Sequence, residues 1–414
     1  MENKIQTISE FPDKVLLKIL SLLPSKDVVA TSVLSKRWRS LWKDVKTFRY
    51  DDDAIRRSYW NFAQFINRRS SVESMHLKMK PVCINKDIKP LVNMAVARSL
   101  RELRIEMICS SFELPKSFYN FSQLETVILE NLSLVDVPPE PDVYMPCLKR
   151  LHLLSVKFSG DESVKRLLSK CPILEDLVVK RSSLTNVMMF TIDVRTLRIL
   201  SIDNTSGKSR PKGVHGFMIN TPSLRYFRIR DSFSNYLQFE NMPRLVKASV
   251  NVVFDNPYKF LGSLSSTQYL SLCSVTSYTA YQPTCSSFYN LDHLELCLCS
   301  AEQWNLLTRI LNNAPRLRLL QLKLYQKHCV KDTINPVLNK PNFVPQSLSS
   351  HLEIFEWRQY NGTQQEREAA KYILANANHL KKATFYSESV EKHVMLKELE
   401  CVTRSSKACL LAFE

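Results

Sequence analysis

The sequence predicts an α/β protein, with three short N-terminal helices, a long solenoid of repeated strands and a final segment of mixed strands and helices. Two observations carry this prediction. Apolar residues recur with a helical period in the first 45 residues, and a nine-residue strand phrase recurs from residue 72 to about 325. A chain of 414 residues exceeds a typical single core, so it is long enough for an elongated array.

The first helix is expected between Pro12 and Pro24. Proline suits the first helical position because it lacks the amide hydrogen that would have no partner there, and a later proline ends a helix. Two apolar faces run along this stretch, with the residues Leu16, Leu20 and Leu23 on one and Val15, Ile19 and Leu22 on the other. A helix that is apolar around most of its circumference is buried on more than one side.

Two further short helices are expected before residue 45. Ser25 is a candidate N-cap for the second. The third places Leu34, Trp38, Leu41 and Trp42 on one face, with basic residues between them. Three such helices cannot bury this much apolar surface alone, so they pack on the rest of the chain or keep a face for another protein.

The stretch "FPDKVLLKILSLLPSKDVVATSVLSKRWRSLW" closely resembles the F-box, especially its plant form, and Phe11-Pro12 stands where that family usually has Leu-Pro. The resemblance implies an F-box over residues 8–50 that docks on the Skp adaptor of a cullin–RING ubiquitin ligase. It also implies the positions of the adaptor contact: Phe11, Pro12, Leu16, Leu17, Ile19, Leu20, Leu23, Pro24, Val28, Val33, Leu34 and Trp38.

The middle of the chain, residues 72–340, repeats one L-x-x-L-x-L phrase. After a weak first copy, ten copies run from "SLRELRIEM" at 99–107 to "RLRLLQLKL" at 316–324, and their starts lie 21 to 27 residues apart. Repetition at such a period is typical of a leucine-rich-repeat solenoid, here an irregular one. Amphipathic helices are expected between some strands, over 161–171 and after a capping box at Ser300–Gln303.

Outward strand positions alternate with the inward leucines and form a stripe that is basic, with few acids, over its first two-thirds. A net charge of +17 favours an acidic partner. The candidate target-binding residues are Arg104, Arg150, His152, Lys180, Tyr226, Arg228, Arg230 and Lys247. The alternative is a solvated face without a ligand.

Residues 341–414 continue the strand phrase and then change character. Asn361-Gly362 is a turn signal, and Thr363 with Glu366 forms a capping box for the next helix. A terminal cap must close the last apolar edge of a solenoid. The stretch "EWRQYNGTQQEREAAKYILANANHLKKATF" resembles the FBD domain, which follows F-box and leucine-rich repeats in plant proteins.

No pattern for catalysis or for a cofactor is present, so we expect a non-enzymatic protein without cofactor. His293 lies near Cys297 and Cys299, but leucines interleave them in strand alternation, which favours an ordinary strand over a metal site. Eleven cysteines at scattered spacings indicate reduced thiols in the cytoplasm or nucleus. Acidic residues before the first apolar run and Lys18 within it argue against a signal peptide, and no stretch is long enough to span a membrane.

The function that these features favour is a substrate-recruiting subunit of a cullin–RING ubiquitin ligase. It would bind the Skp adaptor, and through it a cullin and a RING subunit, together with a target protein whose surface is acidic. Two alternatives stay open: a basic nucleic-acid-binding protein, favoured mildly by the charge and by "GKSRPKG" at 207–213, and a small-molecule-gated receptor with a pocket on the solenoid lined by arginine and aromatic residues.

Overall fold

The structure is a computed structural model that forms two compact units, residues 1–187 and 188–414. The part of the chain that it describes comprises residues 8–51, 56–79, 88–107, 122–134, 137, 145–182, 186–206, 213–253, 260–275, 287–298, 302–323, 343–389 and 392–414. The expected capping box at Ser300–Gln303 falls partly outside these residues, and the stretch at 207–213 falls largely outside them.

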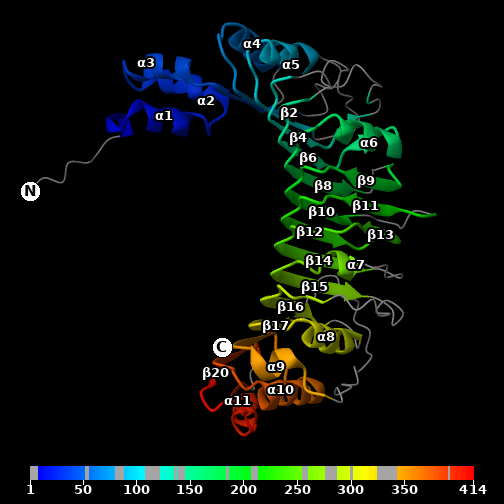
Figure 1. Cartoon of the computed structure of the whole chain (residues 1–414). Coiled ribbons are helices and arrows are strands. Elements are labelled where there is room, and N and C mark those ends of the chain that lie inside the picture. The colour runs from blue at the N-terminus through cyan, green and yellow to red at the C-terminus, as the bar shows by residue number, and fades with distance from the viewer. Residues whose placement is uncertain are drawn as a thin grey trace, which may run out of the picture. The chain divides into compact units, whose positions relative to one another are not determined.

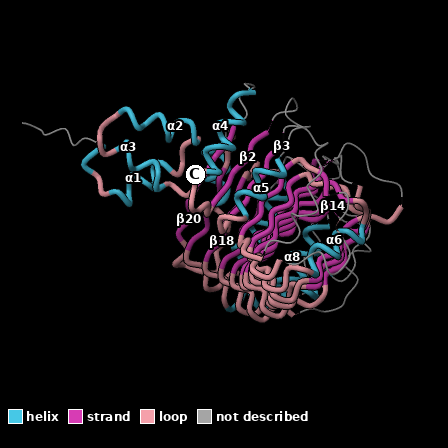
Figure 2. The backbone as a smooth tube through the Cα atoms, turned by 90° about the horizontal axis from the view of Figure 1, so that it is seen from above, coloured by secondary structure: helices cyan, strands magenta, loops and turns pink. Residues whose placement is uncertain are grey.

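The first unit begins with three short α-helices, α1 (Asp13–Leu20), α2 (Ser25–Ala30) and α3 (Trp38–Leu41), which form a group of their own (Figures 1 and 2). Single 3₁₀ turns extend them: η1 (Ile8–Glu10), η2 (Thr31–Val33) and η3 (Trp42–Asp44). They share one small core, formed by Leu16, Leu20, Val28, Trp38, Leu41 and Val45.

Three expectations about the ends of these helices were wrong. Pro12 precedes α1 rather than occupying its first position, and α1 ends at Leu20, four residues ahead of Pro24, which was expected to end it and which directly precedes α2. Ser25 lies inside the first turn of α2, and its hydroxyl accepts a hydrogen bond from the Arg49 amide (2.9 Å) instead of capping the helix. The Ser25 hydroxyl, which was expected to cap α2, is therefore hydrogen-bonded to the strand that follows the helices.

The rest of the first unit is a parallel sheet whose strands follow sequence order. The strands are β1 (Thr47–Asp51), β2 (Ser74–Met79), β3 (Glu102–Met107), β4 (Thr126–Glu130), β6 (Arg150–Leu154) and β8 (Asp176–Ser182). Helices α4 (Arg56–Asn67), α5 (Ile88–Val96) and α6 (Asp161–Ser169) connect some of them, and β5 (Ser133–Leu134) pairs with β7 (Lys157–Phe158). Parallel strands joined by such crossovers are the geometry of a repeat solenoid.

The second unit continues the same pattern, and Figure 1 shows its strands stacked one after another. The strands are β10 (Ile199–Ser206), β12 (Tyr226–Asp231), β14 (Lys247–Val253), β15 (Tyr269–Val275), β16 (His293–Cys297), β17 (Leu319–Lys323), β18 (Ile354–Arg358), β19 (Lys382–Tyr386) and β20 (Leu410–Phe413). Neighbouring strands among them pair in parallel from β10 to β20, as β14 and β15 do. The predicted α/β solenoid after an N-terminal helical segment is confirmed.

The leucine phrase explains this regularity. Each strand begins three residues into its phrase, and the leading leucine packs inside, as Leu124 and Leu224 do. Along β12, Phe227 and Ile229 are buried while Tyr226 and Arg228 are exposed. Alternation with period 2 therefore separates an inner apolar face from an outer polar one.

The returns between strands differ from the expectation in one respect. Helices α6 and α8 (Glu302–Asn313) are present, and a four-residue helix, α7 (Phe260–Ser263), lies in another return. Between them, however, β9 (Met189–Asp193), β11 (Gly216–Asn220) and β13 (Tyr236–Phe239) form a second parallel sheet. Buried side chains alternate along these strands too, but each strand is so short that its sequence is consistent with an irregular connection.

The end of the second unit is a compact αβ segment. It contains α9 (Gln346–Ser350), α10 (Gln364–Asn376) and α11 (Lys392–Glu400) beside the strands β18, β19 and β20. The predicted capping box is confirmed, since the Glu366 amide donates to the Thr363 hydroxyl (3.3 Å) and the Thr363 amide donates to the Glu366 carboxylate (3.0 Å). The turn before it has a positive φ at Gly362 (67°), as the Asn-Gly signal predicts.

Candidate functional site

The N-terminal helical segment, residues 8–50, divides its apolar side chains between a core and an outer surface. On α1, Leu16 and Leu20 point into the core, whereas Val15 is exposed. The turn after the helix keeps a helical path, because the Leu22 amide donates to the Ile19 carbonyl (3.1 Å), so Leu22 continues the outer side and is 66% exposed. The first apolar face predicted for this helix is thus internal and the second is external.

The residues that the resemblance marked for an adaptor contact fall into three groups. Leu16, Leu20, Val28 and Trp38 are buried in the core of the segment, so they hold its shape and have no surface to offer. Leu17, Ile19, Leu23 and Pro24 are partly buried, and Phe11, Pro12, Val33 and Leu34 are exposed.

Some exposed apolar residues were absent from that expectation. Together with three of the expected positions they make what we call the outer apolar set: Ile8, Phe11, Val15, Leu22, Val33 and Leu34. Val33 is 85% and Leu34 is 60% exposed, although both belong to the short turn between α2 and α3. The helical period of Val15, Ile19 and Leu22 was the sequence signal that could have identified the missing positions.

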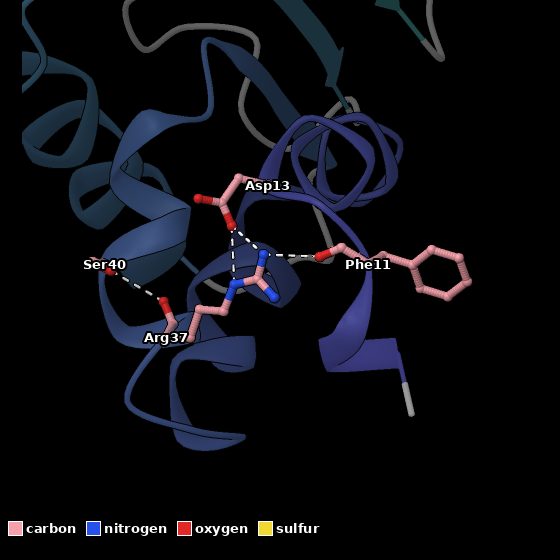
Figure 3. Close-up of polar contacts among 4 residues, drawn as sticks. All are labelled: Phe11, Asp13, Arg37 and Ser40. Atoms are coloured by element: carbon pink, nitrogen blue, oxygen red, sulfur yellow. Dashed lines mark hydrogen bonds and ion pairs between the residues drawn. The ribbon is translucent and has the colours of Figure 1, made fainter. Parts of the chain in front are cut away.

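One arginine ties the start of α1 to the turn before α3 (Figure 3). The Arg37 guanidinium donates to the Asp13 carboxylate through Nε (2.9 Å) and to the Phe11 carbonyl through Nη2 (2.8 Å). Charge-assisted bonds from a planar guanidinium fix orientation as well as distance. Arg37 therefore joins the backbone at Phe11 and the first residue of α1 to the turn before α3.

The three helices of this segment pack against strand β1 at its end and against helix α4, which comes next in the chain. Arg49 of β1 donates from Nε to the Ser21 carbonyl (3.1 Å), and Trp42 stacks on Phe65 of α4 with ring centroids 5.8 Å apart. The Arg69 guanidinium lies 4.6 Å from the Trp42 ring centroid, and burial lowers the pKa of Arg69. These contacts anchor the inner side of the segment and leave the outer apolar set clear.

In the first unit, the candidate target-binding residues lie on the outer side of the sheet, but acids accompany them. Arg104 and His152 occupy the same row as Ile128, in register across β3, β4 and β6. The Arg104 Nη2 atom lies 3.6 Å from a Glu106 carboxylate oxygen and 3.5 Å from one of Glu130. The stripe is therefore less basic here than the sequence predicted, because the neighbouring row carries the acids Glu106 and Glu130.

The other two candidates of the first unit are exposed. Arg150 begins β6 in register with Asp176, and Lys180 lies near the end of β8. Burial lowers the pKa of His152, so its imidazole is held in the neutral form and adds no charge to this face.

In the second unit, Tyr226 and Lys247 are in register at the starts of β12 and β14, and both are exposed. Arg228 is exposed in the middle of β12, whereas Arg230 forms an ion pair with Asp203 of β10. Only part of the expected positive charge is thus open to a ligand.

Other expected features can be placed as well. His293 and Cys297 lie in strand β16 with Cys297 buried, and Cys299 is outside the described residues. Among the residues that the structure describes, no cluster of three or more histidine, cysteine or acidic side chains could hold a metal ion, and no disulfide joins the cysteines. In the same residues, no helix combines the length and apolarity needed to cross a membrane.

Comparison with known protein families gives matches along the chain. The F-box domain matches residues 8–50, the leucine-rich repeats of the FBD-associated F-box protein At5g56370 match residues 89–210, and the FBD matches residues 340–385. The helical segment with the outer apolar set is the part that matches the F-box.

Three proteins of Arabidopsis thaliana are similar over nearly the whole chain. The FBD-associated F-box protein At1g50980 is 67% identical over 96% of this chain and 89% of its own length. The FBD-associated F-box protein At5g56560 is 46% identical over 98% and 99% of the two chains. The F-box/FBD/LRR-repeat protein At5g56420 is 39% identical over 98% of each.

Proposed function

The chain belongs to the plant F-box proteins that carry leucine-rich repeats and an FBD domain, and on this premise we propose that it is a substrate-recruiting subunit of a cullin–RING ubiquitin ligase. Its F-box would dock on a Skp-type adaptor, which connects it to the cullin and RING subunits. Its repeat strands would hold the target protein.

The observation that carries the adaptor contact is the outer apolar set. The F-box fills its own core with Leu16, Leu20 and Trp38 and still leaves Leu22, Val33 and Leu34 largely in water. Large aliphatic side chains grouped on a short segment in this way are typical of a protein–protein interface. The buried residues act indirectly, because they position the exposed ones.

The role proposed for the chain is placement rather than chemistry. A target bound to the repeats is kept at a high effective concentration near the subunits that transfer ubiquitin. Its site of action is proposed to be the cytoplasm or nucleus, where cysteines at scattered spacings stay reduced.

The test is adaptor capture by the full chain with Leu34→Asp. Leu34 is exposed, so an aspartate there should leave the melting temperature unchanged but place a charge in the interface. We expect Leu34 to act as a hot spot of the interface, where loss of a side chain costs about 2 kcal/mol or more, which corresponds to roughly 30-fold weaker binding to a purified Skp-type adaptor.

The matched control is Val214→Asp, which places the same charge at an exposed valine of the second unit. It should bind the adaptor as the wild type does. If Leu34→Asp and Val214→Asp bind the adaptor equally well, the outer apolar set is not the docking surface and the proposal fails.

A further inference from the structure

A cavity of about 790 Å³, lined by charged, polar and aromatic residues, lies in the second unit, where the strands from β12 to β17 begin. Its walls include Tyr226, Lys247, Tyr269, His293, Arg316 and Arg318. The volume lies within the range of ligand pockets in proteins. Of the lining residues, the sequence pattern singled out only Tyr226 and Lys247 as candidates for target binding.

The floor of this cavity is a row of side chains from adjacent strands. Lys247, Tyr269 and His293 are in register on β14, β15 and β16. The Lys247 ammonium lies 4.1 Å from the Tyr269 ring centroid, and the rings of Tyr269 and His293 are 4.4 Å apart. Burial lowers the pKa of His293, so its ring is an uncharged part of the floor. Lys247 is thus held by an aromatic face rather than by an acid.

The rim of the cavity carries an excess of positive charge. Arg316 and Arg318 precede β17, and within the described part of the chain Arg316 forms no ion pair. Asp292 is the acid among the lining residues, and its carboxylate lies 3.7 Å from Nε of Arg318 with both side chains largely exposed. Exposed ion pairs of this kind are weak. The cavity therefore suits an anionic ligand.

Its extent indicates what kind of anion. Tyr226, Lys247, Tyr269, His293 and Leu319 are in register across five neighbouring strands. Adjacent strands are about 4.8 Å apart, so this row spans about 19 Å, which is the length of about six residues of extended chain. Gln268 and Asn290 lie along the same walls and can bond a peptide backbone. A single small anion would leave most of these groups unused.

We propose that this cavity binds an extended acidic segment of the target protein, about six residues long, with carboxylates reaching Lys247 at one end and Arg316 and Arg318 at the other. This inference rests on the proposed function, because it names the part of a target that the repeats would hold. The exposed ring of Tyr226 extends the aromatic floor beyond Lys247.

The probe is a fluorescently labelled hexaglutamate peptide, titrated with the full chain while anisotropy is recorded near physiological ionic strength. The double variant Lys247→Ala/Arg318→Ala removes one cation from each end of the cavity. It should bind the peptide at least about tenfold more weakly than the wild type, a loss of about 1.4 kcal/mol. Its melting temperature should be unchanged, because both side chains are exposed.

The control variant Arg309→Ala/Lys371→Ala removes two exposed cations of the same unit from helices α8 and α10. It should change binding less than about twofold, as surface charges outside the site contribute only through the general field. Equal weakening in both variants would mean that net charge alone attracts the peptide, and would overturn the inference.

Two further arms separate a segment from an isolated anion. Triglutamate should bind more weakly than hexaglutamate at the same carboxylate concentration, and inorganic phosphate at that concentration should not displace hexaglutamate. Displacement by phosphate, or equal binding of the two peptides, would overturn the inference. Adaptor capture is measured on the same proteins, so failure here with normal adaptor binding leaves the proposed function standing.

Discussion

The two ends of this protein use apolar side chains in opposite ways. The F-box buries a core of six residues and keeps large aliphatic side chains in water at several positions along α1 and the turn after α2. The FBD segment gathers Phe355, Trp357, Tyr360 and Phe385 into a buried aromatic cluster, with the Trp357 and Tyr360 ring centroids 5.3 Å apart. The large exposed apolar side chains described there are Phe343 and Val344 at the start of the segment and the separate residues Val394 on α11 and Leu410 on β20.

This difference indicates different tasks. A solenoid needs its last apolar edge closed, and the FBD segment does this with its own strands β18, β19 and β20 and with rings that pack on one another. The F-box packs nine apolar residues in or against its core and still leaves six large ones exposed. Surface that stays uncovered in this way fits a partner, whereas the FBD cluster fits stability.

The largest effect is expected from Trp357→Ala in the FBD cluster. Trp357 is 1% exposed, and its removal should cost about 3–5 kcal/mol of the free energy of unfolding, through lost burial and the cavity left behind. The measurement is urea unfolding of the full chain, with Phe343→Ala as control because Phe343 is 85% exposed. If the two variants unfold at the same urea concentration, the cluster does not stabilise this end.

Leu20→Ala tests the core of the other end. Leu20 of α1 is buried in the core of the F-box, so we expect its truncation to lower the local stability by about 2–5 kcal/mol. The loss should be seen as faster hydrogen exchange in α1. Leu22→Ala lies two residues away on the outer side and should change that stability by less than about 0.5 kcal/mol, while it weakens adaptor capture. The comparison breaks down if Leu22→Ala slows or speeds exchange as much as Leu20→Ala does.

Thr363→Ala should have a smaller effect on the FBD segment. It removes the hydroxyl that accepts the Glu366 amide at the start of α10, a loss of about 1 kcal/mol for an N-cap. Thr363→Ser keeps that hydroxyl and serves as the control in the same unfolding experiment. Equal stability of the alanine and serine variants would show that α10 is held by packing alone.

The repeat strands could be predicted closely from the sequence because their signal is both local and repeated. Each leucine phrase yields a strand, and the Thr363 capping box forms as its four residues predict. The second sheet of β9, β11 and β13 was not predicted, because its strands lie between the leucine phrases and their apolar alternation recurs in only three of the described returns.

The candidate sites were harder to predict, because exposure depends on what a side chain meets in three dimensions. The family resemblance marked Leu16 and Leu34 alike, yet one fills the core and the other faces water. Similarly, Arg104 appeared to be an available cation, but Glu106 of its own strand and Glu130 of the neighbouring strand β4 lie beside it. The Glu106 contact follows from strand alternation, whereas the Glu130 contact depends on register between strands, about which a single sequence carries little information.

The smallest effect concerns pH and the strands that follow the F-box. His76 of β2 lies in register with Arg49 of β1 and Arg104 of β3, and burial together with these cations lowers its pKa, which Glu106 opposes in part. The unfolded chain has a histidine pKa of about 6.5, so below that pH it binds more protons than the folded chain. The free energy of unfolding should therefore fall as the pH drops from about 6.5 towards the folded pKa, and should be unaffected by this group well above 6.5.

The measurement is the melting temperature as a function of pH for the wild type and for His76→Gln, in which the acid-dependent decrease should be shallower. Adding His152→Gln should flatten it further, because burial also lowers the pKa of His152. Parallel pH profiles for all three proteins would show that these imidazoles do not couple folding to protonation. The strands beside the F-box and the FBD end could then not be distinguished by their sensitivity to acid.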